Sequence, residues 1–248
     1  SALLGNAALL QYVTAGVDFI PLTHFPPSLP IAFNGGGYAE PMAEHALAMA
    51  LAAAKRLFVE HENLRAGAFN QFTPNRLLAG RGAGILGYGG IGVATARLCQ
   101  ALGMRVHAIN RRGVGDEYVD WIGKPADLHE LLAVSDVLVL SLSLTKASTG
   151  LLGASELSRM KEDAILVNLA RGEIVDEDAL YSFLQERPNF TACIDAWWVE
   201  PVRHGEFSMR HDFLSLPNVI ASPHNSASTG DWYLVALERA LENCKRVL

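Results

Sequence analysis

Apolar residues fall in short runs over the last two thirds of the chain, and amphipathic stretches separate these runs. Short apolar runs bounded by turn residues are typical of strands that a sheet buries on both faces. The predicted strands are 83–87, 105–110, 137–142, 164–168, 191–195 and 219–222. The predicted helices lie near 90–102, 126–133, 154–160, 176–186 and 229–247. This alternation predicts an α/β fold in which helices cover both faces of a doubly wound parallel sheet.

The first third of the chain has a different pattern. We expect a strand over 9–15, then a loop through Asp18, a proline-rich stretch and a long helix over about 40–58. Pro41 lies in the first turn of that helix, where proline is favoured. The polar segment 59–78 is predicted to be a linker across the surface.

The segment 84–92 joins an apolar strand to glycines with the spacing G-x-G-x-x-G. Gly87 permits a tight turn, Gly89 lets a pyrophosphate approach the backbone, and Gly92 lets the following helix pack close to the strand. The amides and dipole at the start of that helix would face the phosphates. The alternative is a glycine-rich turn in another kind of α/β protein. The strand before the glycines and the helical run 93–99 after them favour a dinucleotide-binding Rossmann sheet.

The end of the second predicted strand selects the cofactor. In this fold an acidic residue about 20 positions past the glycines binds the ribose 2′-hydroxyl. Asn110 stands there, 18 residues after Gly92, and Arg111 and Arg112 follow it. Arginines would hold a 2′-phosphate that an aspartate would repel. The sequence therefore predicts NADP(H) in preference to NAD(H), with a solvated basic turn in an NAD(H) enzyme as the alternative.

Composition excludes several other classes. The 248 residues suffice for one large domain or two modest ones. A formal net charge of −6, without a cluster of basic residues, argues against nucleic-acid binding. No secretory signal is visible, and the small-apolar run 46–54 is too short to span a membrane. Three scattered cysteines (Cys99, Cys193, Cys244) in apolar runs indicate reduced, buried thiols of a cytoplasmic protein rather than disulfides or a metal site.

Three polar side chains follow the ends of late strands. Arg171 comes after 164–168, Glu200 after 191–195 and His224 after 219–222. Ligands of open α/β sheets bind outside the carboxyl ends of the strands, so these residues would converge where a nicotinamide lies. Singly, Arg171 could be a surface ion-pair partner, Glu200 a solvated loop acid and His224 a capping residue. Their order after a dinucleotide motif indicates one catalytic site.

With these residues the sequence resembles the D-isomer-specific 2-hydroxyacid dehydrogenases over nearly its whole length. Segments 14–18 and 43–47 are similar to the family's substrate loop and to the start of its interdomain helix. Segment 142–145 is similar to its loop after the fourth cofactor-domain strand, although Ser143 stands where proline is usual. Arg171, Glu200 and His224 match its catalytic arginine, glutamate and histidine. Trp197 and Trp198 replace a more usual aliphatic–aromatic pair, and either pack under the loop or narrow a substrate pocket.

The resemblance implies hydride transfer between a small 2-oxo acid and its D-2-hydroxy acid. Arg171 would bind the carboxylate and polarise the adjacent carbonyl, while the amides near Ala15 and Gly16 hold the other carboxylate oxygen. His224 would protonate the developing alkoxide and act as the base in the reverse direction. Glu200 would orient the imidazole and favour its protonated form.

The resemblance also implies cofactor contacts at the glycine loop, the basic turn and the strand ends, and a homodimer formed through the interdomain helix. Asp195 would contact the nicotinamide carboxamide. The implied cofactor residues are Gly87, Tyr88, Gly89, Gly90, Ile91, Gly92, Asn110, Arg111, Arg112, Leu142, Ser143, Leu169, Ala170, Asp195 and Ser226.

Four segments follow from the resemblance. Residues 1–56 would be the remnant of an incomplete flavodoxin-like substrate domain plus the interdomain helix, and 57–78 the linker. Residues 79–225 would be the NAD(P)-binding Rossmann domain, and 226–248 a helix returning towards the substrate domain. Because family members have another strand–helix stretch before the segment that starts here, we expect part of a longer protein rather than a reduced homologue.

Other functions stay open beside an NADPH-dependent reductase of small 2-oxo acids such as glyoxylate or hydroxypyruvate. One is a non-catalytic dinucleotide sensor similar to the corepressors of this superfamily, and the intact Arg–Glu–His set argues against it. Another is a formate- or phosphite-type dehydrogenase. Formate dehydrogenases of the superfamily usually carry glutamine in place of Glu200, which disfavours that alternative.

Overall fold

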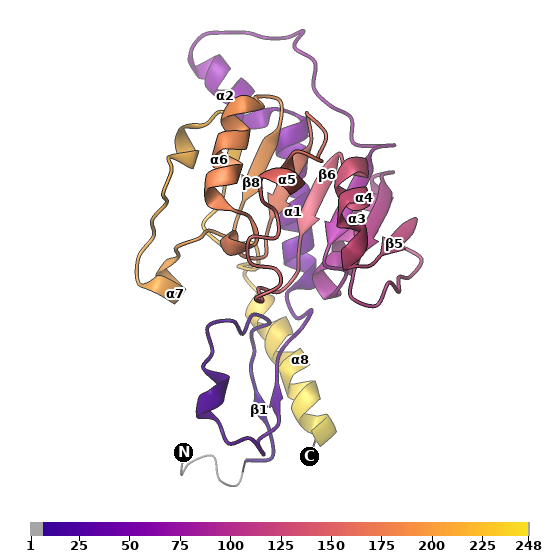
Figure 1. Cartoon of the computed structure of the whole chain (residues 1–248), viewed down its shortest axis with the longest axis vertical. Helices are drawn as coiled ribbons and strands as arrows, with labels where there is room; N and C mark the ends of the chain where they lie inside the picture. The colour runs from indigo at the N-terminus through magenta and orange to yellow at the C-terminus, as the bar shows by residue number, and fades with distance from the viewer. Residues whose placement is uncertain (1–6, 248) are drawn as a thin grey trace.

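A parallel sheet is the centre of the molecule. The computed structural model describes residues 7–247, so residues 1–6 of the first expected segment and Leu248 lie outside the described residues. Within that range a seven-stranded sheet has the order β5–β4–β3–β6–β7–β8–β9, and each neighbouring pair is parallel. This order is that of a doubly wound Rossmann sheet. The predicted α/β fold class is confirmed (Figure 1).

The strands follow the predicted apolar runs within one or two residues. They are β3 (Gly82–Leu86), β4 (Arg105–Ile109), β5 (Trp121–Gly123), β6 (Val137–Leu140), β7 (Ile165–Asn168), β8 (Thr191–Ile194) and β9 (Val219–Ala221). Among the seven strands of this sheet, β5 was not predicted. It is a three-residue edge strand with two half-buried residues, which is too short to give a recognisable apolar run.

Helices cover both faces of the sheet. The helices are α1 (Ala39–Ala54), α3 (Gly90–Ala101), α4 (Leu128–Val134), α5 (Ala154–Leu157) and α6 (Glu177–Glu186). Side chains of α1 and α3 share one apolar cluster with Ile85, while α4, α5 and α6 share another with Leu86. Successive strand residues therefore point to opposite faces, as the strand pleat requires.

The interdomain segment is not the single helix 40–58 that we expected. The chain breaks at Arg56, whose φ of 56° is left-handed, and α2 (Leu57–Arg65) then runs in a new direction. The expected linker 59–78 is therefore helical in its first part. Amphipathic spacing alone could not locate a break that depends on one residue's backbone angle. One further expectation was wrong: Cys99 and Cys193 are buried free thiols, but Cys244 is only half-buried.

Residues 7–38 form a small lobe beside the sheet domain, called here the N-terminal lobe. Its strands β1 (Leu10–Gln11) and β2 (Ile31–Ala32) pair in parallel, and β1 is far shorter than the predicted 9–15. The C-terminal helix α8 (Trp232–Val247) returns to lie along this lobe (Figure 1). The amide of Asn34 joins the two by donating to the carbonyl oxygens of Val13 at 3.0 Å and Ala236 at 2.8 Å. No helix within residues 7–247 has the length and apolar character needed to cross a membrane.

Candidate active site

The glycine loop between β3 and α3 has the geometry of a phosphate cradle. Gly87 has a φ of 109°, and a Cβ there would lie 2.6 Å from the backbone nitrogen of Leu142. A Cβ at Gly92 would overlap the carbonyl oxygen of Gly87. At Gly89, by contrast, no atom lies within 4 Å of the Cβ position, so a ligand can approach this backbone. The open space lies beside the unpaired amides at the start of α3, which suits the pyrophosphate of a dinucleotide.

Gly90, the first residue of α3, also brings the two parts of the molecule together. A Cβ at this position would lie 2.6 Å from the Cα of Gly36 in the N-terminal lobe. Gly36 itself has a φ of 80°, which favours glycine. The sequence assigned Gly90 only to cofactor binding, because the approach of a residue 54 positions away leaves no mark in local sequence.

The basic turn after β4 is held by Asn110. Its Oδ1 accepts hydrogen bonds from the backbone N–H of Arg112 at 3.0 Å and of Gly113 at 2.7 Å, and its amide donates to the carbonyl of Val114 at 2.8 Å. The side chains of Arg111 and Arg112 are exposed. Asn110 is therefore engaged by its own loop, and the two guanidinium groups are the charges that this turn presents.

Tyr88 connects the glycine loop to the same region. Its ring is buried, and its hydroxyl donates to the carboxylate of Asp116 beyond the basic turn. Burial and the neighbouring Asp116 raise the pKa of Tyr88, so it stays a neutral donor. Tyr88 therefore braces the glycine loop against the segment that carries Arg111 and Arg112.

His224 and Glu200 come together although they are 24 residues apart. Nδ1 of His224 lies 2.8 Å from Oε1 and 2.9 Å from Oε2 of Glu200. The Glu200 side chain is 7% exposed and that of His224 is 35% exposed. Burial raises the pKa of Glu200, but hydrogen bonds from His224 and the Trp197 amide, with the charges of His224 and Arg171, outweigh it and lower the pKa overall. An ionised Glu200 only accepts hydrogen bonds, so Nδ1 carries a proton and Nε2 is left to exchange one.

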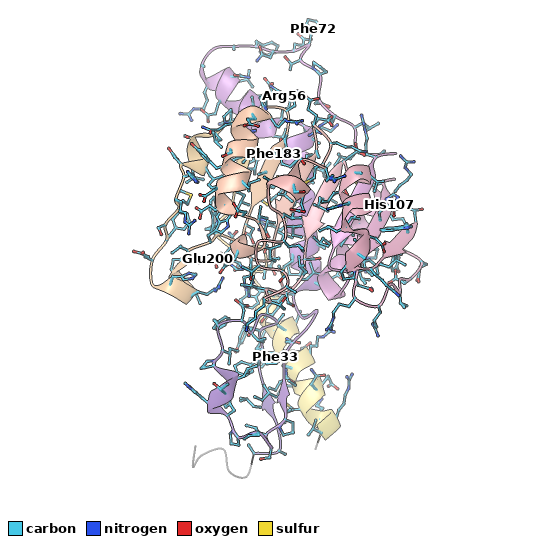
Figure 2. The ribbon with its side chains drawn as sticks, in the orientation of Figure 1. Phe33, Arg56, Phe72, His107, Phe183 and Glu200 are labelled. Carbon is cyan, nitrogen blue, oxygen red and sulfur yellow. The ribbon has the colours of Figure 1, made fainter. Side chains whose placement is uncertain are left out.

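His224 itself has an unusual backbone. Its φ of 51° is in the left-handed region, which is uncommon for residues other than glycine. Such conformations persist where the surroundings enforce them, and they gather at functional sites. Figure 2 places Glu200 at the edge of the sheet domain that faces the N-terminal lobe, far from Arg56 and Phe72.

Asp195 is fully buried at the end of β8 and is held by several donors. Oδ1 accepts from the hydroxyl of Ser222 at 2.6 Å and from the amide of Asn225 at 3.1 Å, and Oδ2 accepts from the amide of Ser226 at 3.3 Å. His45 of α1 approaches Ser222, with Nε2 3.0 Å from its hydroxyl oxygen. Since the Ser222 proton goes to Asp195, Nε2 of His45 is the donor of that bond.

The remaining predicted cofactor residues lie at the same strand ends. Leu142 and Ser143 follow β6, and the buried residues Leu169 and Ala170 follow β7. The hydroxyl of Ser226 is buried without a hydrogen-bond partner among residues 7–247. An orphaned buried hydroxyl next to Asp195 suits a polar ligand group, such as a carboxamide. The residues present therefore fit a nicotinamide dinucleotide.

Arg171 meets the N-terminal lobe through a residue that sequence reasoning missed. Its Nε lies 3.2 Å from both carboxylate oxygens of Asp18, and its Nη2 lies 2.9 Å from Oδ1. Arg203 approaches the other oxygen of Asp18 at 3.5 Å. The expected substrate amides are adjacent, because a Cβ at Gly16 would overlap Nη2 of Arg171. Asp18 belongs to the loop motif 14–18, which could have marked it, whereas nothing local marks Arg203.

Both tryptophans pack rather than protrude. Trp197 and Trp198 are 4% and 9% exposed. Their indole N–H groups donate to the carbonyls of Ser222 and Val175 at 2.9 and 2.8 Å. These contacts support the packing interpretation of the pair and fix the loop that carries Glu200.

Residues 47–226 match the family model described as the NAD-binding domain of D-isomer-specific 2-hydroxyacid dehydrogenases. The chain belongs to this family. It is 34% identical over 227 residues to the D-3-phosphoglycerate dehydrogenase of Archaeoglobus fulgidus, an alignment that covers 90% of this chain and 42% of the relative. It is 36% identical over 197 residues to the glyoxylate reductase of Thermococcus gammatolerans, covering 75% of this chain and 57% of the relative.

Solved structures of D-isomer-specific 2-hydroxyacid dehydrogenases and related proteins have the same architecture. A glycerate dehydrogenase related protein from Thermoplasma acidophilum superposes with a TM-score of 0.76 at 34% identity, covering 96% of this chain and 81% of that one. The D-isomer specific 2-hydroxyacid dehydrogenase of Xanthobacter autotrophicus Py2, in complex with NADPH and MES, has a TM-score of 0.82 at 27% identity, covering 99% and 76%. The chain covers 42% of the length of the Archaeoglobus fulgidus relative and 57% of that of the Thermococcus gammatolerans relative.

Proposed function

We propose that this protein is an NADPH-dependent reductase that interconverts a small 2-oxo acid and its D-2-hydroxy acid. The observation that carries the proposal is the paired His224 and Glu200, with Arg171 close enough for its charge to lower the pKa of Glu200. An acid–base pair beside a carboxylate-binding arginine is the set that ketone reduction next to a carboxylate requires.

Each side chain has a distinct role in this proposal. Arg171 binds the substrate carboxylate and polarises the neighbouring carbonyl. His224 donates the proton from Nε2 to the developing alkoxide, while Glu200 holds Nδ1 and stabilises the imidazolium. The backbone at Ala15 and Gly16 lies against the substrate carboxylate. When bound, the cofactor supplies or accepts the hydride.

The proposed cofactor site runs along the carboxyl ends of the strands. The loop from Gly87 to Gly92, with Ile91 in the first turn of α3, would hold the pyrophosphate, and Leu142, Ser143, Leu169 and Ala170 would line the nicotinamide side. Asp195 and the orphaned hydroxyl of Ser226 would face the carboxamide. The exposed Arg111 and Arg112 support NADP(H) over NAD(H), because they are the charges that the turn presents to a 2′-phosphate.

A spectrophotometric panel tests the proposal. NADPH loss is followed with glyoxylate, hydroxypyruvate and pyruvate, and with NADH in parallel. We expect turnover of at least one of these acids and a lower Michaelis constant for NADPH than for NADH. Tight NADPH binding without turnover of any acid would instead favour the dinucleotide sensor. Reduction of NADP⁺ or NAD⁺ by formate or phosphite would favour the formate- or phosphite-type dehydrogenase.

The homodimer and a cytoplasmic location are further parts of the proposal. Large apolar side chains are exposed along α2 and the segment after it, with Phe58 59%, Phe69 76% and Phe72 91% exposed. Exposed apolar groups of this size gather at protein interfaces. The three free thiols support a reducing compartment. Light scattering of the wild type and of Phe72→Ser would test the interface, and loss of the dimer is expected in the variant.

A further inference from the structure

Asp18 lies on the N-terminal lobe and Arg171 on the sheet domain, and their contact joins the two. The carboxylate covers one edge of the guanidinium: Nε is 3.2 Å from both oxygens, and Nη2 is 2.9 Å from Oδ1. Nη1 donates to the carbonyl of Ala170 at 2.7 Å. The side chains are well shielded, since Arg171 is 16% and Asp18 12% exposed.

The donors of Arg171 can be counted. A guanidinium has five N–H groups. Asp18 takes the one on Nε and one on Nη2, and Ala170 takes one on Nη1. Among residues 7–247, one N–H on Nη1 and one on Nη2 have no hydrogen-bond partner. Two such donors match the two oxygens of a carboxylate, or one carboxylate oxygen and the adjacent ketone oxygen.

We propose that Asp18 is a positioning residue that holds the Nε–Nη2 edge of Arg171 and directs its remaining donors at the substrate carboxylate. This inference rests on the proposed function, because it gives Arg171 a substrate to bind. The opposite arrangement would make Asp18 a competitor, occupying the place of the substrate and leaving when the substrate arrives. The two arrangements contain the same atoms but predict opposite effects when the charge of Asp18 is removed.

The surroundings of Asp18 favour positioning over competition. Arg203 lies 3.5 Å from its second oxygen, and Arg203 is itself fixed by Glu173 through bonds of 2.6 and 3.1 Å. Asp18 therefore lies between two guanidinium groups, and the four side chains together carry no net charge. An incoming carboxylate that displaced Asp18 from Arg171 would leave this shielded carboxylate with Arg203 alone of its two cationic partners, which costs free energy. Binding at the free donors of Arg171 requires no such displacement.

Asp18→Asn is the decisive variant, because it keeps the shape of the side chain and removes its charge. We expect the KM for glyoxylate to rise at least tenfold and kcat to fall severalfold, since Arg171 also polarises the carbonyl. The dissociation constant for NADPH, measured by fluorescence, should stay within twofold. Asp178→Asn removes one charge from an exposed carboxylate away from these residues and should leave both constants unchanged. A KM for glyoxylate that falls in Asp18→Asn would overturn the proposal and establish competition.

A second measurement does not depend on turnover. The ¹⁵N-labelled Nε–H signal of Arg171 is assigned by its loss in Arg171→Lys. It should be shifted downfield and exchange slowly in the wild type, and lose both properties in Asp18→Asn. Addition of oxamate, an unreactive analogue of a 2-oxo acid, with NADPH should leave the Nε–H signal of the wild type in place. An oxamate-induced move towards the Asp18→Asn position would show displacement and overturn the proposal.

The kinetic and the Nε–H experiments together separate a failure of this inference from a failure of the proposed function. If the wild type turns over no 2-oxo acid and does not respond to oxamate, the proposed function fails, while the Nε–H comparison in the free protein still decides whether Asp18 holds Arg171. Asp18→Glu keeps the charge and should restore the Nε–H signal and part of the lost KM. Circular dichroism accompanies each variant, and Asp18→Ser, which also removes the charge, replaces Asp18→Asn in both experiments if the latter does not fold.

Discussion

Nδ1 of His224 lies within 2.9 Å of both carboxylate oxygens of Glu200. The carboxylate is fixed in turn, because Oε1 also accepts the amide of Trp197 at 2.7 Å. The imidazole is thus held in one tautomer by a group that is itself immobile. The left-handed backbone of His224 aims the ring from the strand end, so the orientation and the tautomer of the imidazole are set before any ligand binds.

Replacing His224 by asparagine tests the acid–base assignment without adding backbone strain, because asparagine tolerates positive φ. We expect kcat to fall by about 10²–10⁴-fold, the usual contribution of a positioned proton donor. The NADPH dissociation constant should change little. Steady-state kinetics and fluorescence titration measure the two quantities. Turnover within tenfold of the wild type would place the proton donor elsewhere.

The cofactor preference is tested by Asn110→Asp. An aspartate keeps the oxygen that accepts the amides of Arg112 and Gly113 but cannot donate to the carbonyl of Val114, so two of these three bonds of the turn remain. The added negative charge would repel a 2′-phosphate and accept the ribose hydroxyls of NADH. We expect the NADPH Michaelis constant to rise at least tenfold while that for NADH stays or falls.

Arg111→Ser with Arg112→Ser is the companion to Asn110→Asp. The double variant removes the charges that the turn presents and should weaken the binding of NADPH but not that of NADH. If the affinities for NADPH and NADH fall equally, the two arginines do not contact a 2′-phosphate. The salt dependence of NADPH binding should also flatten in the double variant, because the lost contacts are charged.

Elements with a strong local signal were predictable. The buried strands β3 and β6 are continuous apolar runs, and the glycines at 87, 89 and 92 predict the turn that follows β3. Arg171, Glu200 and His224 were placed at one sheet edge because the carboxyl ends of parallel strands share that edge. Periodicity was therefore enough for the sheet, and strand topology for the hypothesis that these three residues share a site.

Contacts between distant segments were not predictable. Asp18 meets Arg171 across 153 positions, and His45 meets Ser222 across 177. Nothing in the local sequence tells which side chains will pair across such distances, and only the docking of the N-terminal lobe and α1 brings these partners together. The break at Arg56 escaped for the same reason, since packing rather than helix propensity decides where α1 ends.

The close approach of the N-terminal lobe to α3 gives a prediction on stability. Alanine at Gly90 would place a Cβ 2.6 Å from backbone of Gly36, which cannot yield as a flexible side chain would. We expect a loss of about 1–3 kcal/mol in the unfolding free energy, as for other overpacked sites. Gly89→Ala is the matched control, because its Cβ meets nothing within 4 Å and its φ of −110° suits alanine. Urea unfolding of the cofactor-free proteins measures both, and equal losses would mean that the approach to Gly36 is not the cause.

Asp136, away from the active site, should give the fold part of its pH dependence. Its Oδ2 accepts the Gly82 amide at 2.7 Å and Lys161 at 2.9 Å, and Arg81 lies 3.5 Å from Oδ1. Burial raises the pKa of Asp136, but these partners outweigh it, and the pKa falls below its ordinary 3.8. The stabilisation is therefore complete above pH 4 and is lost as the pH falls through the lowered pKa.

Asp136→Asn removes that stabilisation at every pH. At pH 7 we expect it to lower the unfolding free energy by about 2 kcal/mol, because the donors then face a neutral acceptor in place of a charged one. The difference from the wild type should narrow steadily below pH 4, as the wild-type carboxyl becomes protonated too. Asp178→Asn, at a carboxylate that is 63% exposed, should stay close to the wild type throughout. Urea unfolding at pH 7, 4 and 3 measures the three proteins, and a gap that stays constant across this range would show that the charge of Asp136 is not what stabilises β3.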